Sequence, residues 1–298
     1  MSPLSNNNNS NIYKPKTPIK TMENKEILPS IIKHKKKIFL VLTLIKIPLL
    51  IYIISILVTV PAITAINTEY NTIKGAHRGD SVENFENTLE AIKNATENQE
   101  YNFIEFDIQY TKDKQRILFH DISLLRTTGN SESIENLTYN ELQELTSFNI
   151  PTYKQAMDTI ENKKKINIEI KSQGNFEDDK ELLDFTIQDC KQRGIINNIM
   201  ISSVSREVIE YSKQKYPEIK TGKIYWILSS TYLPFDFLTE NLYQDINEMQ
   251  ADYIMLHGAN INNMSDLIEQ KPKDKTLCFW YFNNEMYILQ KDNTDGMW

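Results

Sequence analysis

The chain has 298 residues, with 33 basic and 40 acidic side chains and a formal net charge of −7. This length accommodates one α/β barrel of ordinary size plus an attachment. The acidic balance argues against a nucleic-acid-binding protein, which would carry a basic surface. The two cysteines, Cys190 and Cys278, are far apart and lie in no ligand-spaced motif. We therefore interpret both as small buried residues rather than as a disulfide.

Residues 1–37 form a polar segment that ends in a basic cluster. The segment contains the run S-N-N-N-N-S at 5–10 and four lysines at 33 and 35–37. Such a composition cannot bury enough apolar area to offset the entropy of ordering the chain. We predict a disordered tail.

Residues 38–66 predict a transmembrane helix. Lys46 is their only charge, and the uncharged part spans about 20 residues, which matches a hydrocarbon core of ~30 Å at 1.5 Å per residue. The alternatives are a cleaved signal peptide and a buried core helix. The stretch is longer than a signal h-region, and no suitable cleavage site follows it. Positive charge before the span predicts a single-pass membrane protein with its N-terminus in the cytoplasm and the remaining chain outside.

Residues 72–298 predict a globular α/β domain. The sequence F-I-E-F-D-I-Q at 103–109 alternates apolar and polar residues, which indicates a strand with one apolar face and with Glu105 and Asp107 on the other. The sequence K-I-N-I-E-I-K at 165–171 repeats the pattern. Strands with apolar outer faces and charged inner faces fit a closed parallel barrel covered by helices, with functional groups at the carboxyl ends of the strands.

The other predicted elements alternate between strand and helix, which favours a parallel architecture. A capping box, T-x-x-E at 138–141, adds a short helix in the polar segment 121–149. Residues 294–298 would supply an eighth strand where the chain stops, so the sequence leaves open a barrel that is incomplete at its C-terminal end. The remaining strands are predicted at 75–79, 116–120, 199–204, 221–227, 253–257 and 276–282, and the helices at 86–98, 152–162, 176–193, 205–216 and 265–270.

Seven short motifs, in this order, resemble the glycerophosphodiester phosphodiesterase family. They are H-R-G at 77–79, E-N-T at 86–88, E-F-D at 105–107, T-K-D at 111–113, H-D at 120–121, R-T-T-G at 126–129 and E-I-K at 169–171. The ordered set is specific, although no single tripeptide is. One departure is Phe85, where the family usually has proline. The resemblance implies a TIM-type (β/α)8 barrel with a small insertion after the second strand. It also implies hydrolysis of glycerophosphodiesters to sn-glycerol 3-phosphate and an alcohol.

The carboxylates of Glu105, Asp107 and Glu169 are the predicted metal ligands. Hard oxygen ligands from two adjacent strands suit Ca²⁺ or Mg²⁺ rather than a zinc site with soft ligands. The alternative is a set of buried ion pairs with Arg78 and Lys171. In the metal interpretation, Arg78 and Lys171 bind phosphate oxygens of the substrate, one as a bidentate fork and the other as a point charge.

His77 and His120 are the candidates for proton transfer, because an imidazole with an unperturbed pKa of ~6.5 can both accept and donate a proton. Asp121 is expected to orient the turn that carries His120. The resemblance places Trp280 at the wall of a substrate pocket, with core packing as the alternative. We interpret His257, at the end of another strand, as structural.

Three functions remain open on the sequence alone. The first is a membrane-anchored, metal-dependent phosphodiesterase that hydrolyses glycerophosphodiesters outside the cytoplasm. The second is a related lipid phosphodiesterase that acts on lysophospholipid or sphingolipid headgroups. The third is a non-catalytic surface protein on a truncated barrel. The intact set of histidines and carboxylates argues against this third function. The sequence identifies neither the alcohol, the preferred metal nor the oligomeric state.

Overall fold

A computed structural model describes Lys46 and, with gaps, residues 71–290. The predicted tail at 1–37 and, apart from Lys46, the predicted membrane span at 38–66 lie outside the described residues. Within the described part, no helix is both long enough and apolar enough to span a bilayer. The described residues are 46, 71–225, 236–258, 260, 264–282 and 284–290.

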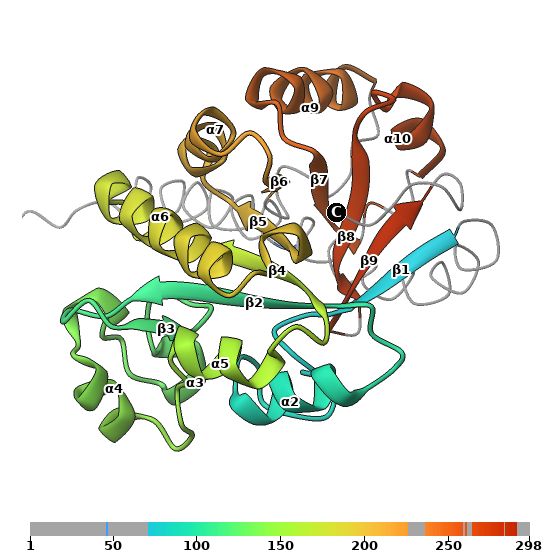
Figure 1. Ribbon diagram of the computed structural model, residues 1–298. Helices are drawn as coiled ribbons and strands as arrows, with labels where there is room; N and C mark the ends of the chain where they lie inside the picture. Colours follow the sequence, from blue (N-terminus) through green and yellow to red (C-terminus); the bar gives the residue numbers. More distant parts are fainter. Residues whose placement is uncertain are drawn as a thin grey trace, which may run out of the picture. The chain divides into compact units, whose positions relative to one another are not determined.

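Eight strands close into a ring at the centre of the fold (Figure 1). Of the strands in this ring, each neighbouring pair from β1 through β2 round to β8 runs parallel, as the alternation of strands and helices predicts. The last strand, β9, runs antiparallel to both β8 and β1 and closes the ring. In ring order the strands are β1 (Asn71–Ala76), β2 (Phe103–Tyr110), β4 (Lys165–Ile170), β5 (Ile199–Ser203), β6 (Lys220–Ile224), β7 (Tyr253–His257), β8 (Thr276–Phe282) and β9 (Glu285–Gln290).

The strand that closes the ring differs from the prediction. The predicted strand at 294–298 lies outside the described residues, whereas β9 follows β8 directly through a hairpin. Asn284, with a φ of 61°, makes this turn possible, because asparagine tolerates the left-handed region better than most residues. A tight hairpin forces an antiparallel pair, whereas a parallel pair needs a long crossover. The barrel is therefore closed but not wholly parallel.

Helices surround the ring (Figure 1), and most lie within a few residues of their predicted positions. Helix α9 was missed, because residues 236–249 mix strong helix formers with aromatic and asparagine residues of weaker propensity. Its Leu242, Ile246 and Met249 recur at intervals of four and three and are buried. The helices are α2 (Leu89–Glu97), α3 (Leu125–Thr128), α4 (Tyr139–Leu145), α5 (Tyr153–Ile160), α6 (Phe176–Gln192), α7 (Arg206–Lys215), α9 (Asp236–Met249) and α10 (Met264–Gln270), with 3₁₀ turns η1 (Ile134–Asn136) and η2 (Ile196–Asn198).

Both faces of the central strands are buried. On β2, Ile104, Phe106 and Ile108 pack with residues of α2, α5 and α6 in one large apolar cluster that also contains the isoleucines of β4. Each fully buried side chain of this size contributes about 1.5–3 kcal/mol to the hydrophobic term. The predicted alternation is confirmed: the apolar residues face the helices, which leaves Glu105 and Asp107 for the interior of the barrel.

A short strand after β2 brings His120 to the carboxyl end of the barrel. Strand β3 (Arg116–Leu118) runs antiparallel to β2, with Leu118 opposite Ile108. The next residue, Phe119, donates its backbone N–H to the carbonyl oxygen of Asp107 at 3.2 Å. This bond holds the returning chain beside the acidic end of β2, where His120 follows.

The insertion after β3 has a small core of its own. The predicted capping box at the start of α4 is present, with Thr138 and Glu141 each accepting a backbone N–H of the other. The buried apolar residues of this part are Ile117, Phe119, Leu124, Ile134, Leu142 and Ile150. The insertion therefore provides a fixed support for the loop that carries His120.

Gly79→Ala is expected to destabilise the fold. Gly79 has a φ of 76°, and a Cβ atom there would lie 2.7 Å from the carbonyl carbon of Ala91. Gly174 is a matched control, because it also has a positive φ but a Cβ would meet nothing within 4 Å. We expect Gly174→Ala to cost about 1 kcal/mol of unfolding free energy and Gly79→Ala at least about 2 kcal/mol more, measured by urea denaturation. Equal losses would show that the contact with Ala91 does not constrain this turn.

Candidate active site

The turn after β1 places His77 and Arg78 over the end of β2. Arg78 and Gly79 both have positive φ angles, 60° and 76°, and a non-glycine residue in this region is strained. Glu105 holds the turn through two bonds. The backbone N–H of Arg78 donates to Glu105 Oε2 at 2.8 Å, and that of Gly79 donates to the Glu105 carbonyl oxygen at 3.0 Å.

Glu105, Asp107 and Glu169 come together inside the barrel. Asp107 is the register partner of Glu169 in the parallel pair β2–β4. One oxygen atom from each residue lies within 4.8 Å of the other two, and all three side chains are buried. Among the described residues, no other group of three histidines, cysteines or acids could hold a metal ion in this way.

The acidic triad fits a hard divalent cation. Glu105 Oε1 and Asp107 Oδ1 are buried and have no hydrogen-bond partner within the described structure. Burial, together with the charges of Asp107 and Glu169, raises the pKa of Glu105 well above its ordinary value. A divalent cation would remove the repulsion among the three carboxylates and would satisfy their free oxygens. The ligand set does not select Ca²⁺ over Mg²⁺.

Two cations flank the triad. Lys171 Nζ lies 2.7 Å from Glu169 Oε1 and 3.5 Å from Asp107 Oδ1, and Arg78 Nε lies 3.7 Å from Asp107 Oδ2. Burial acts to raise the pKa of Asp107, but Lys171, His120 and Arg78 together lower it below its usual range. The ion pairs of the alternative interpretation are therefore present. They do not exclude a cation, because Glu105 Oε1 has no hydrogen-bond partner among the residues that the structure describes.

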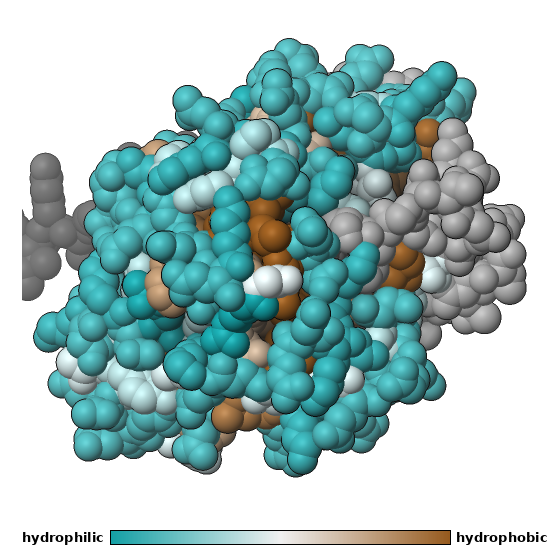
Figure 2. Space-filling model, viewed as in Figure 1, coloured by the Kyte–Doolittle hydropathy of each residue, from teal (hydrophilic) through white to brown (hydrophobic). Residues whose placement is uncertain are grey.

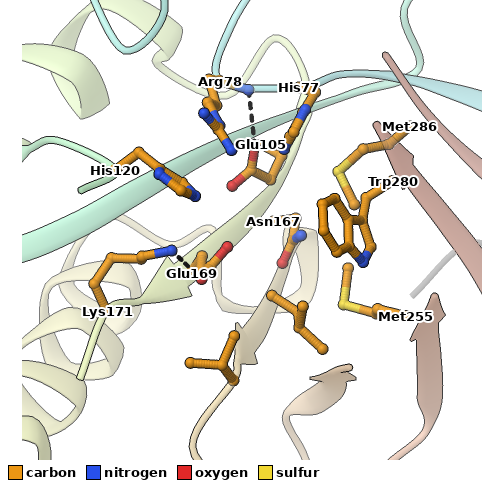
Figure 3. Close-up of a pocket in the computed structure, with 12 residues that line it drawn as sticks. His77, Arg78, Glu105, His120, Asn167, Glu169, Lys171, Met255, Trp280 and Met286 are labelled. Carbon is orange, nitrogen blue, oxygen red and sulfur yellow. Dashed lines mark hydrogen bonds and ion pairs between the residues drawn. The ribbon is translucent and has the colours of Figure 1, made fainter. Parts of the chain in front are cut away.

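His77 and His120 line the same pocket (Figure 3). His77 Nε2 lies 3.8 Å from Glu105 Oε2. Burial, followed by the charge of Arg78, lowers the pKa of His77 well below its ordinary value, which favours the neutral ring. His120 Nδ1 lies 2.5 Å from Asp121 Oδ1. A carboxylate acceptor assigns the proton to Nδ1 and leaves Nε2 for the pocket, in agreement with the expected orienting role of Asp121.

The opposite wall of the pocket is apolar. It is formed by Val204, Ile224, Met255, Trp280 and Met286, and Figure 3 shows the Trp280 ring between the two methionines and across from the charged groups. Figure 2 shows hydrophobic residues inside a hollow that hydrophilic residues surround. The pocket therefore combines one strongly polar side with one water-excluding side.

The profile of the Glycerophosphoryl diester phosphodiesterase family matches residues 77–297, which include every residue of this site. The chain belongs to this family. It is accordingly a phosphodiesterase.

Individual relatives agree with the family assignment. The protein YhdW of Bacillus subtilis is 29% identical over 240 residues, which cover 74% of this chain and 91% of YhdW. A glycerophosphodiester phosphodiesterase of Caldanaerobacter subterraneus is 31% identical over 165 residues, covering 52% of this chain and 67% of the relative. A phosphodiesterase from Oleispira antarctica, solved in complex with the product sn-glycerol-3-phosphate, shares the fold. Its TM-score is 0.55 at 21% identity, with 72% of this chain and 86% of that chain covered.

A chain of alternating charges in this phosphodiesterase links Arg78 to His120. Arg78 Nη1 donates to both carboxylate oxygens of Glu86, at 3.1 and 3.0 Å. Arg126 Nη1 donates to Glu86 Oε2 at 3.1 Å, and Arg126 Nε donates to Asp121 Oδ2 at 2.6 Å. Asp121 in turn contacts His120. The motifs that contain Glu86 and Arg126 are visible in the sequence, but they assign these two residues no role, because ion pairs between distant segments cannot be derived from spacing.

Asn87, of the same E-N-T motif, was also given no role. Its Nδ2 donates to Asp107 Oδ2 at 2.8 Å, and its Oδ1 accepts the backbone N–H of Asp107 at 3.2 Å. Its φ of 56° places the side chain in this position. Asn87 thereby orients one of the three carboxylates from outside the triad.

His257 and the cysteines of this phosphodiesterase take no part in the charged site. His257 is buried and packs edge-to-face on Trp280, with ring centroids 5.0 Å apart. Burial lowers the pKa of His257 to about 4. Cys190 and Cys278 are buried free thiols, as predicted.

Proposed function

We propose that this protein hydrolyses glycerophosphodiesters to sn-glycerol 3-phosphate and an alcohol, with a divalent cation, Ca²⁺ or Mg²⁺, as cofactor. The observation that supports this most is the meeting of Glu105, Asp107 and Glu169 with two histidines in one pocket. The named relative from Caldanaerobacter and the product bound to the Oleispira enzyme support the choice of substrate.

The phosphate would lie between the acidic triad and the two cationic side chains. Glu105, Asp107 and Glu169 would hold the cation, which would supply positive charge that lowers the barrier to attack on phosphorus. Arg78 and Lys171 line the pocket and hold the non-bridging oxygens of the diester. Both already carry carboxylate partners, which keep their charged groups in place before substrate binds.

His77 and His120 transfer the protons. One imidazole accepts the proton of the attacking oxygen as that oxygen bonds to phosphorus. The bond from phosphorus to the alcohol oxygen breaks, and the other imidazole gives this oxygen its proton. Over the complete reaction, one water molecule divides the diester into sn-glycerol 3-phosphate and the free alcohol. The Trp280 wall limits the access of bulk water to the bound substrate.

A second candidate substrate is a lysophospholipid or a sphingolipid headgroup. The apolar wall formed by Val204, Ile224, Met255, Trp280 and Met286 favours it, because such a wall can accept hydrocarbon. The third function considered from the sequence, a non-catalytic protein on a truncated barrel, is not retained. The ring of strands is closed, and the chain is a phosphodiesterase.

The full-length chain is expected to release choline from glycerophosphocholine at a higher kcat/KM than from lysophosphatidylcholine. EDTA should remove the activity, and Ca²⁺ or Mg²⁺ should restore it, because the triad oxygens need a cation to hold the phosphate. Choline release can be measured with a coupled oxidase assay. A preference for lysophosphatidylcholine would establish the second candidate, and EDTA-resistant activity would exclude the cation.

We further propose the arrangement that the sequence predicts for the rest of the chain. It has a cytoplasmic tail at 1–37, a transmembrane helix at 38–66 and the phosphodiesterase domain at 72–298, outside the cytoplasm. This rests on the basic cluster before the apolar stretch. Protease added to intact cells is expected to digest an epitope fused after Trp298 and to spare one fused before Met1. The reverse pattern would invert the orientation, and a mature N-terminus after Ala65 would replace the anchor with a signal peptide.

A further inference from the structure

Asn167 is a buried amide inside the pocket, and neither end of it has a hydrogen-bond partner among the described residues. It lies on β4, its side chain is fully buried, and it lines the same pocket as the histidines. Neither Oδ1 nor Nδ2 has a hydrogen-bond partner in the described part of the chain. In Figure 3 the Asn167 side chain lies between the acidic groups and the Trp280 ring.

A buried amide without hydrogen-bond partners implies that a ligand binds to it. Buried polar side chains in folded proteins nearly always have a partner, because an amide without one loses its hydration and gains nothing in return. Ile224, Met255 and Met286 line one side of the pocket, and none of the described polar side chains that line its other side bonds to the Asn167 amide. We therefore expect the molecule that fills the pocket to supply the hydrogen-bond partners of Asn167.

The donors and acceptor of the Asn167 amide match hydroxyl groups better than they match a cation. A metal ion could take only Oδ1 and would leave both N–H donors unpaired. A hydroxyl group both donates and accepts, so two neighbouring hydroxyls can satisfy the carbonyl and the amino group together. The argument does not depend on which end of the amide is oxygen and which is nitrogen, because neither end has a partner in the part of the chain that the structure describes.

The position of Asn167 in the barrel fits the same ligand. Asn167 is the register partner of Glu105 and precedes Glu169 by two residues on β4, a rise of about 6.6 Å toward the amino end of the strand. Asn167 therefore lies level with Glu105 and deeper in the barrel than Asp107 and Glu169, where it can reach a short polyol chain that extends inward from a phosphate at the triad.

We propose that Asn167 recognises the two free, adjacent hydroxyl groups of the glycerol moiety and thereby selects glycerol phosphates over simple alkyl phosphates. The proposal rests on the function proposed above and names the side chain that selects its substrate class. The carbon atoms of the glycerol would lie against the apolar side chains. The alcohol that leaves would face the mouth of the pocket.

Binding of two phosphates tests this proposal without turnover. Calorimetry with the full-length chain and Mg²⁺ would compare sn-glycerol 3-phosphate with n-propyl phosphate, which has the same phosphate group but neither hydroxyl. The wild-type protein is expected to bind the glycerol compound about 10²-fold more tightly, because the propyl compound leaves the amide unpaired. In Asn167→Leu, which has a similar shape, and in Asn167→Ala the ratio should fall to within about threefold.

Ser202→Ala is the matched control. Ser202, on β5, is also fully buried and its Oγ also lacks a partner in the described structure, but it does not line this pocket. The control is expected to keep the wild-type ratio. A ratio that survives in both Asn167 variants, or that is lost equally in Ser202→Ala, would overturn the proposal.

Two further outcomes separate this proposal from its alternatives. Titration with Mg²⁺ alone should give the same affinity for the wild type and for Asn167→Leu. A weaker affinity in the variant together with an unchanged phosphate ratio would make Asn167 a metal ligand and overturn the proposal. Choline release from glycerophosphocholine reports on the proposed function separately. A wild-type chain that cleaves neither glycerophosphocholine nor other glycerophosphodiesters but shows the ratio, lost in the variants, would refute that function and uphold hydroxyl recognition by Asn167.

Discussion

Glu105→Gln is expected to reduce hydrolysis by at least about 10²-fold, because it removes one negative charge from the three that would hold the cation. The amide keeps the size of the side chain and can still accept the N–H of Arg78, which Glu105 Oε2 binds at 2.8 Å. The turn with His77 should therefore stay in place. Choline release would measure the loss of hydrolysis, and calorimetric titration with Ca²⁺ and with Mg²⁺ would measure the loss of cation affinity.

The same variant should not lose stability when no cation is present. Burial raises the pKa of Glu105 in the folded protein, so the folded state prefers the protonated acid. A raised carboxyl pKa makes the fold less stable as pH rises from the unfolded value, ~4.3, toward the folded one. At pH 7 in EDTA, Glu105→Gln is thus expected to melt at or above the wild-type temperature. Added cation should raise the melting temperature of the wild type alone.

Asp252→Asn is the control for the loss of a carboxylate. Asp252 lies at the amino end of β7, at the opposite end of the barrel, and pairs with Lys213 at 2.6 Å and Lys220 at 3.0 Å. It should bind cation as the wild type does. Full activity in Glu105→Gln, or a loss of cation binding in both variants, would remove the triad from consideration as the metal site.

The fold was predictable wherever a strand carried its own pattern. The alternation in 103–109 and 165–171 predicts which residues face the helices. The structure places Ile104 and Ile168 in the apolar cluster between the strands and the helices. The closing strand could not be found in this way, because β8 and β9 form a nearly continuous apolar and aromatic stretch, T-L-C-F-W-Y-F and then E-M-Y-I-L-Q. The turn between them depends on the φ of one asparagine and on pairing with β1, which is distant in sequence.

The members of the candidate site were easier to predict than their connections. Acids two residues apart on one strand must point the same way, so Glu105 and Asp107 were predictable as a pair. The link from Arg78 through Glu86 and Arg126 depends on contact between the segment before α2 and helix α3, which are distant in sequence. Asn167 was passed over for a different reason: an asparagine between isoleucines resembles a neutral strand position, and only its missing partners in the structure single it out.

Removing either histidine is expected to lower kcat by roughly 10²–10⁴-fold. His77→Ala and His120→Ala each delete one of the two proton transfers, while the triad and Arg78 remain to bind phosphate. KM should therefore change much less than kcat. Because the two imidazoles serve one reaction, the double variant should lose less than the product of the two single losses. His257→Ala is the control, since His257 is buried beside Trp280 but does not line the pocket.

The two histidines can be told apart by the leaving group. Departing p-nitrophenolate needs no proton, so a glycerophosphodiester of p-nitrophenol should restore most of the activity of the variant that lacks the acid and none of the variant that lacks the base. The wild-type pH profile should be bell-shaped, and each variant should lose one limb. Asp121→Asn should act in the same direction as His120→Ala but more weakly, because it disturbs the bond of 2.5 Å to His120 Nδ1 and leaves the ring in the pocket. Near-normal turnover of glycerophosphocholine by His77→Ala would refute the division of proton transfer between the two histidines. Equal activity of both histidine variants on the glycerophosphodiester of p-nitrophenol would refute it as well.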